Sequence, residues 1–175
     1  EGLRLQQAST VINLANLVVG TPLTETLVLD FQDRLQKSGL FDRAIVTADA
    51  DPAQAAQARV LVRVEESTRQ QVVLGLGVSA NTGPRATFEH IDRRLFDQAL
   101  TSRNKFELGQ SRQAWDGDLS TQAGPGLYRW IAGGTLERLV SDADTVQTQR
   151  LRLGRAQDAP RIERLYFVEA DRSSR

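Results

Sequence analysis

The 175 residues suffice for one ordinary domain, or for one small domain followed by an extended part. Basic and acidic residues number 22 each, so the net charge gives no reason to expect nucleic acid as a partner. The chain has no cysteine and a single histidine, which excludes disulfides, thiolate chemistry and His/Cys metal clusters. A metal could be held only by carboxylates, and we expect no metal and no cofactor.

A first helix is predicted between a capping hydroxyl and a glycine. Ser9 or Thr10 is the candidate N-cap, and Gly20 follows the last expected turn. The apolar residues expected to share one face of this helix are Val11, Ile12, Ala15 and Val18.

A second helix carries clearer signals at both ends. Thr24 is a candidate N-cap, Glu25 lies in the first turn where the helix dipole favours a carboxylate, and Gly39 ends the helix. Apolar residues four apart predict the buried face, namely Leu27, Phe31 and Leu35.

Two short strands follow, at residues 45–48 and 58–64, joined by a loop at 49–57. Alternation in the second strand separates its valines from Arg59 and Arg63. Residues 3–5 are expected to be the end of an earlier strand. The order of helix, helix, strand and strand predicts a small α+β unit with the helices on one face of a sheet.

From residue 72 onward the apolar residues alternate, which predicts strands with one apolar face. One side of the first such strand would present Val72, Leu74, Leu76, Val78 and Ala80. Extended segments are then expected at 85–96, 105–109, 115–121, 127–140, 145–154 and 161–169. Membrane β-barrels use strands of about 9 to 11 residues, and such strands escape a hydropathy scan.

Two sets of sequence phrases are distinctive. The first is Gly20-Thr21-Pro22 with the run from Asp30 to Phe41, and the second is the run from Leu74 to Ser79, the turn at 82–85 and Arg93-Arg94-Leu95-Phe96. The first set resembles the helix and following strand of the last POTRA domain in the BamA/TamA family of outer-membrane assembly factors, and the second resembles that family's first barrel hairpin. The resemblance is closer to TamA than to BamA. The two sets of phrases together cover nearly the whole chain.

The resemblance implies an α+β POTRA domain at 1–68, truncated at its first strand, and antiparallel strands of an incomplete outer-membrane β-barrel at 69–175. The POTRA domain would lie in the periplasm. Such a factor inserts other barrel proteins into the membrane, so its partners would be unfolded outer-membrane proteins or autotransporters, outer-membrane lipid and an inner-membrane protein. We expect the strands here not to close a barrel alone, and to self-associate through free edges.

The resemblance also supplies candidate site residues. The edge that would pair with a client strand is Val72, Val73, Leu74, Gly75, Leu76, Gly77 and Val78. The POTRA edge strand, which would capture an extended peptide, contains Ile45, Val46 and Thr47. The hairpin turn of the family corresponds to Thr82, Gly83, Pro84 and Arg85. An unpaired strand edge is a template for another chain, and Gly75 and Gly77 weaken the strand that must separate.

Other readings of the sequence have less support. His90 has no nucleophile beside it, and Asp116 with Asp118 is better explained by a water-facing surface than by acid/base catalysis, so we expect no enzyme. Aromatic residues that suit either a membrane-interface girdle or core packing are Trp115, Tyr128, Trp130 and Tyr166. The alternative functions are a two-partner-secretion pore and a soluble α+β binding protein.

Overall fold

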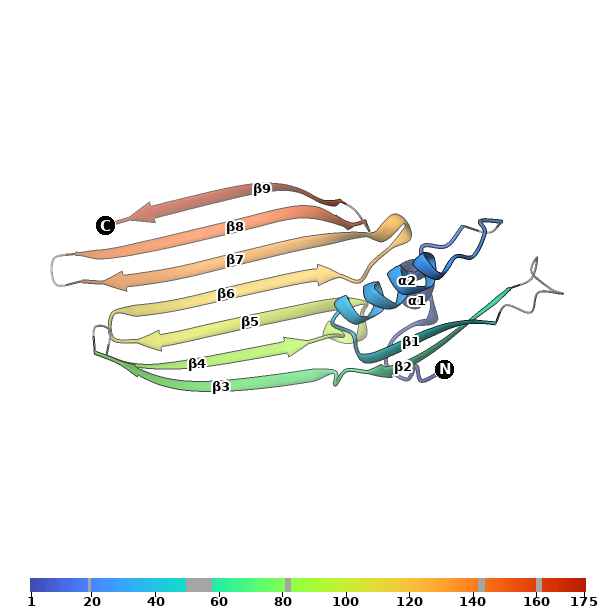
Figure 1. Ribbon diagram of the computed structural model, residues 1–175. Helices are drawn as coiled ribbons and strands as arrows, with labels where there is room; N and C mark the ends of the chain where they lie inside the picture. The colour runs from blue at the N-terminus through green and yellow to red at the C-terminus, as the bar shows by residue number, and fades with distance from the viewer. Residues whose placement is uncertain (19, 50–57, 81–82, 142–143, 160–161) are drawn as a thin grey trace. The chain divides into compact units, whose positions relative to one another are not determined.

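In the computed structural model the chain forms two compact units, and the structure describes residues 1–18, 20–49, 58–80, 83–141, 144–159 and 162–175 (Figure 1). Unit 1 comprises Glu1–Thr68, Ala123–Tyr128 and Asp158–Ile162. Unit 2 comprises Arg69–Gln122, Arg129–Gln157 and Glu163–Arg175. No helix in the described ranges is long and apolar enough to cross a membrane.

Helix α1 (Ala8–Ala15) is shorter than the sequence predicts, and only part of its predicted face packs against the core. Its N-cap is Gln7, without a side-chain hydrogen bond, so the expected caps at Ser9 and Thr10 are wrong. The helix ends at Asn16, whose left-handed conformation stops it before Gly20. Leu14 and Thr10 are buried, and the predicted Val11 and Ala15 are partly buried against the core. Ile12 and Val18 are exposed, because apolar residues lie on several sides of the segment and tertiary packing decides which of them are covered.

Helix α2 (Glu25–Lys37) begins and ends where the sequence predicts. The Thr24 hydroxyl accepts a hydrogen bond from the Leu27 amide at 3.3 Å, and Glu25 lies in the first turn. Phe31 and Leu35 are fully buried, and Gly39 follows the helix with a φ of 70°. The predicted bounds and the burial of Phe31 and Leu35 are confirmed, whereas Leu27 is only partly buried.

Strands β1 (Phe41–Asp49) and β2 (Arg59–Glu66) pair antiparallel and extend beyond the predicted segments. The predicted strand at 3–5 is wrong, because the amides of Arg4, Leu5 and Gln6 turn to the Glu66 carboxylate. Glu1 bonds to the backbone of β2, donating to the Val62 carbonyl and accepting from the Val64 amide. Most of the predicted 49–57 loop, from residue 50, lies outside the described residues.

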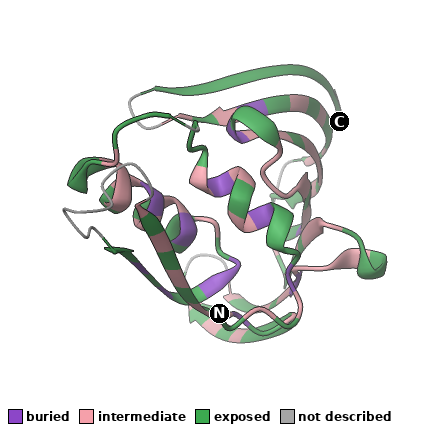
Figure 2. Cartoon of the chain, turned by 90° about the vertical axis from the view of Figure 1, so that its right-hand side faces the viewer, coloured by how far each residue is buried: buried purple, intermediate pink, exposed green. Residues whose placement is uncertain are grey.

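The core of unit 1 lies between the two helices and the β1–β2 pair (Figure 2). Its buried members are Leu14, Phe31, Leu35, Leu40, Phe41, Ala44 and Val46. Unit 1 therefore has the α+β arrangement that the sequence predicts. The short helical turn η3 (Pro125–Leu127) also belongs to this unit, and its Leu127 is 2% exposed.

Unit 2 is a seven-stranded antiparallel sheet whose strands follow one another in chain order (Figure 1). The strands are β3 (Gln70–Ser79), β4 (Gly83–Asp92), β5 (Leu100–Gly109), β6 (Arg112–Thr121), β7 (Tyr128–Val140), β8 (Thr145–Asp158) and β9 (Glu163–Ser174). Residues 95–97 form a short turn, η2 (Leu95–Asp97), between β4 and β5. In this order β3 and β9 are the two outer strands.

The register gives this sheet one apolar and one polar face, because residues that pair across strands share a face. One row of paired residues is apolar and consists of Leu74, Phe88, Phe106, Trp115 and Leu136. The next row, on the opposite face, consists of Val73, Glu89, Lys105, Asp116 and Thr135. The alternation predicted from residue 72 onward is confirmed.

Candidate functional site

Strand β3 presents large apolar side chains at the end of the strand order. Leu74, Leu76 and Val78 are 75%, 91% and 86% exposed. The strand Gln70–Ser79 contains no charged residue and no proline, which are the usual protections of an exposed edge. This strand contains all seven residues predicted to pair with a client.

The glycines of β3 make room for side chains of β4 on the polar face. A Cβ on Gly75 would lie 2.4 Å from the Thr87 hydroxyl, and one on Gly77 would lie 3.2 Å from Nε of Arg85. Packing against β4 therefore explains why both positions are glycine, and the sequence alone does not predict this. The two glycines also weaken β3, because glycine lowers strand propensity.

The predicted hairpin turn lies only partly in the described residues. Thr82 lies outside them, whereas Gly83 begins β4 with a φ of 70°, a conformation that favours glycine. Pro84 and Arg85 pair with Val78 and Gly77 in the first rungs of the β3–β4 ladder.

A cluster of charged residues that sequence reasoning missed holds the start of β3 to the β4–β5 turn. Arg69 Nη1 lies 2.8 Å from the Asp97 carboxylate, and its Nη2 donates to the Arg94 carbonyl at 3.2 Å. Asp92 is 5% exposed and accepts from the Arg94 amide and from Gln70. Phe96, held in a left-handed conformation, is 80% exposed at this turn.

The polar face of the sheet carries ion pairs between neighbouring strands. Arg112 lies 2.7 Å from Glu107 and also pairs with Glu137. Arg152 lies 2.6 Å from Glu169 on the next strand. Such ladders are typical of a sheet face that meets water, whereas the opposite face of the same strands is apolar.

The residues considered for catalysis are dispersed. Asp116 accepts a hydrogen bond from the Thr135 hydroxyl on the polar face, and His90 pairs in register with Asn104 on the apolar face. Asp118 lies on the polar face with Asp116, as predicted. No group of three or more His, Cys, Asp or Glu side chains within the described ranges is arranged to hold a metal ion.

Strand β1, the second predicted edge, is covered by two glutamines of α2. The Val46 amide donates to Oε1 of Gln32 at 3.0 Å, and the Ala44 carbonyl accepts from Nε2 of Gln36 at 3.4 Å. Val46 is buried, whereas Ile45 is 47% exposed. Two backbone groups that point away from β2 are thus already bonded within unit 1.

Between these glutamines in sequence, Arg34 holds α1 in place. Its Nε and Nη2 donate to the carbonyls of Leu14 and Ala15, each at 2.7 Å, which satisfies two carbonyls at the end of α1. Burial lowers the pKa of Arg34, and Asp30 and Asp33 oppose this shift. The guanidinium stays charged at neutral pH because its ordinary pKa is so high.

The chain combines a small α+β unit with a seven-stranded antiparallel sheet that has one apolar and one charged face. It is similar to the crystal structure of BamA from Haemophilus ducreyi lacking POTRA domains 1–3, with a TM-score of 0.59 and 11% sequence identity. The likeness covers 87% of this chain and 30% of that one, so the chain spans less than a third of the BamA chain. No protein-family model and no curated protein matches the sequence.

Proposed function

We propose that this chain is part of an outer-membrane protein assembly factor of the BamA/TamA kind, and not an enzyme. The observation that carries the proposal is β3, an outer strand of a two-faced sheet with apolar side chains exposed and with neither charge nor proline along its length. An exposed apolar edge of this kind is a hazard in water and is useful only where another strand or lipid meets it.

The proposed mechanism is strand addition. Residues 72–78 would offer backbone donors and acceptors to an unfolded barrel client, and the apolar and polar faces would align with the alternating side chains of the client strand. The new strand would thereby continue a sheet whose outer face suits lipid and whose inner face suits water.

Unit 1 would serve as the periplasmic POTRA domain of the factor. Its order of elements and its core support this assignment, and the edge of β1 would be its site for an extended peptide. The closer similarity to TamA rests on the sequence phrases at 20–22, 30–41 and 82–85. An inner-membrane partner and autotransporter clients are part of the same proposal.

Single cysteines test strand addition directly, because the natural chain has none. Leu74→Cys lies on the outer strand β3, and Leu119→Cys lies on β6 between β5 and β7, on the same face. Each variant would be presented, during assembly in vitro, with a barrel client carrying one cysteine in a terminal strand. Residues opposite each other in paired strands have Cβ atoms about 4.5–5.5 Å apart, which is close to the separation of about 3.5–4.5 Å in a disulfide.

We expect a client disulfide with Leu74→Cys and none with Leu119→Cys. Equal crosslinking at both positions would indicate nonspecific contact, and no crosslink at β3 while clients still assemble would contradict strand addition there. A passive secretion pore would export its substrate without any crosslink at β3.

A further inference from the structure

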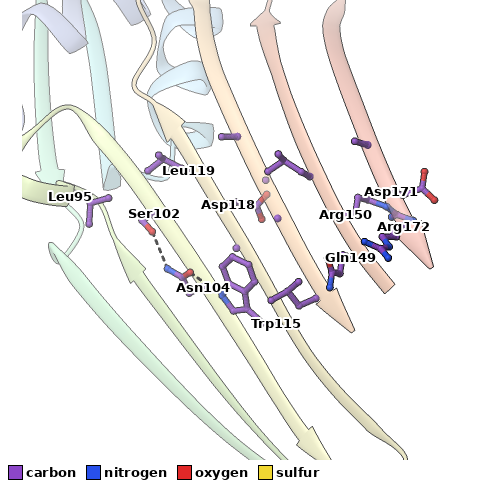
Figure 3. Close-up of a pocket in the computed structure, with 17 residues that line it drawn as sticks. Leu95, Ser102, Asn104, Trp115, Asp118, Leu119, Gln149, Arg150, Asp171 and Arg172 are labelled. Carbon is purple, nitrogen blue, oxygen red and sulfur yellow. Dashed lines mark hydrogen bonds between the residues drawn. The ribbon is translucent and has the colours of Figure 1, made fainter. Parts of the chain in front are cut away.

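Two adjoining hollows lie on the apolar face of the sheet and together form what we call the apolar groove. The first has a volume of about 620 Å³ and the second about 590 Å³, and both are bordered by Leu119 and Ala132 (Figure 3 shows the first). The groove crosses strands β5 to β9 within unit 2.

Small residues create this groove. Gly117, Ala132 and Gly134 carry little or no side chain, and larger residues such as Trp115 and Leu151 border the space they leave. The Trp115 ring lies against the glycines, since a Cβ on Gly117 would be 2.4 Å from it and one on Gly134 would be 3.2 Å away. Its Nε1 donates to Asn104 at 3.2 Å, so the indole nitrogen is satisfied within the sheet.

The first hollow is also lined by two arginines and two aspartates, namely Arg150, Arg172, Asp118 and Asp171, whose charges balance. The end of the groove in the second hollow is cationic and aromatic. Trp130, Arg155 and Tyr166 border it, and the Arg155 guanidinium lies 5.6 Å from the centre of the Trp130 ring. These residues lie near the start of β7, the end of β8 and the start of β9. In an antiparallel sheet these strand termini lie side by side at the same end of the strands. Tryptophan, tyrosine and arginine at strand ends are typical of the level of lipid headgroups.

We propose that the apolar groove binds one acyl chain of an anionic phospholipid, with the phosphate at Arg155. The inference rests on the proposed function, which places this face of the sheet in lipid. Charge favours this ligand, because the apolar groove leads to a guanidinium at the headgroup level. A peptide suits the groove poorly, because each strand from β5 to β8 lies between two others and leaves no backbone partners for it.

The two tryptophans of the chain provide the reporter, because Trp115 and Trp130 each line one of the hollows. The full chain would be reconstituted in phosphatidylcholine bilayers that contain a minor fraction of lipid brominated on the acyl chain, since bromine quenches tryptophan on contact. One series uses brominated phosphatidylglycerol and the other brominated phosphatidylcholine at the same fraction.

We expect brominated phosphatidylglycerol to bind about fivefold more favourably than brominated phosphatidylcholine, as one basic residue at an anionic surface implies. Arg155→Gln should abolish the preference. The matched control Arg138→Gln lies on the same face near the other end of β7, lines neither hollow and should keep it. Ala132→Phe, which fills the shared wall, should reduce quenching by both lipids while the circular dichroism of the sheet stays unchanged.

Each other outcome has a distinct meaning. Equal quenching of the natural chain by the two brominated lipids overturns the anionic site and leaves the proposed function intact. Unchanged quenching in Ala132→Phe places the lipid outside the groove and overturns the inference as well. No quenching by either lipid removes this face from the membrane and overturns both the inference and the proposed function.

Discussion

The two strands predicted to pair with other chains, β1 in unit 1 and β3 in unit 2, protect their edges differently. The outward amide of Val46 and carbonyl of Ala44 on β1 are bonded to side chains of α2. Strand β3 has neither charge nor proline between Gln70 and Ser79. A peptide that adds to β1 must displace two side-chain hydrogen bonds worth about 0.5–1.5 kcal/mol each, whereas β3 carries no such protection in its own sequence.

The two strands also differ in where their apolar side chains lie. On β1 the buried residues Ala44 and Val46 pack into the core, so the strand is already stabilised within unit 1. On β3 both faces are open, with Val73 45% and Leu74 75% exposed. The edge of β1 is therefore already bonded within unit 1, whereas under the proposed function lipid and a neighbouring strand would cover β3.

The largest expected effect separates the two faces of β3 itself. Leu74→Arg places a charge on the apolar face and should cost about 2–4 kcal/mol in a bilayer. Val73→Arg places the same charge on the polar face, in register with Glu89, and should change stability by less than about 0.5 kcal/mol. Urea unfolding of the two variants in vesicles, followed by tryptophan fluorescence, measures both changes in stability.

Val73→Arg is the matched control, because the two residues are neighbours on one strand and both are apolar. Equal destabilisation by the two variants would mean that β3 does not separate lipid from water. The proposal that lipid covers the apolar face of β3 would then be wrong.

A smaller effect is expected in the unit that carries the covered edge. Arg34→Ala removes two charge-assisted hydrogen bonds to the end of α1 and should destabilise unit 1 by about 1.5–3 kcal/mol. Arg34→Lys keeps the charge but cannot donate to both carbonyls, so its stability should lie between those of the natural chain and Arg34→Ala. The helical circular dichroism signal measures the loss, because both described helices lie in unit 1.

Tryptophan fluorescence is the internal control for the Arg34 variants. Trp115 and Trp130 both lie in unit 2, so their unfolding transition should stay in place. A transition that moves together with the helical signal would show that the two units do not unfold separately, and the contrast between β1 and β3 would lose its basis.

The sequence predicts much of this fold because its signals are local. Thr24 and Gly39 mark the ends of α2, and alternation from Val72 onward predicts a sheet with two unlike faces. The signal fails at α1, where Ile12 is exposed and Leu14 is buried. There the apolar residues do not define one face, and contacts with α2 decide which residues are buried.

The covering of β1 and the Arg69 cluster are beyond sequence prediction for a different reason. Gln32 reaches Val46, and Arg69 reaches Asp97, across chain segments whose register is known only after folding. A polar residue on a helix has no periodic pattern that names its partner. An apolar stripe on a helix does have a periodic pattern, because all of its residues face the same core, and the sequence therefore predicts which residues are buried.

The smallest effect tests the covering of β1 atom by atom. Gln32→Met keeps the shape of the side chain and removes the oxygen that accepts from the Val46 amide, which should cost about 1 kcal/mol. Gln32→Glu keeps an acceptor at the same place and should restore most of the lost stability of unit 1. Hydrogen exchange at the Val46 amide should be about fivefold faster in the methionine variant and near the natural rate in the glutamate variant. If both variants exchange at the natural rate, Gln32 does not cover the Val46 amide, and the contrast between β1 and β3 then rests on Gln36 alone.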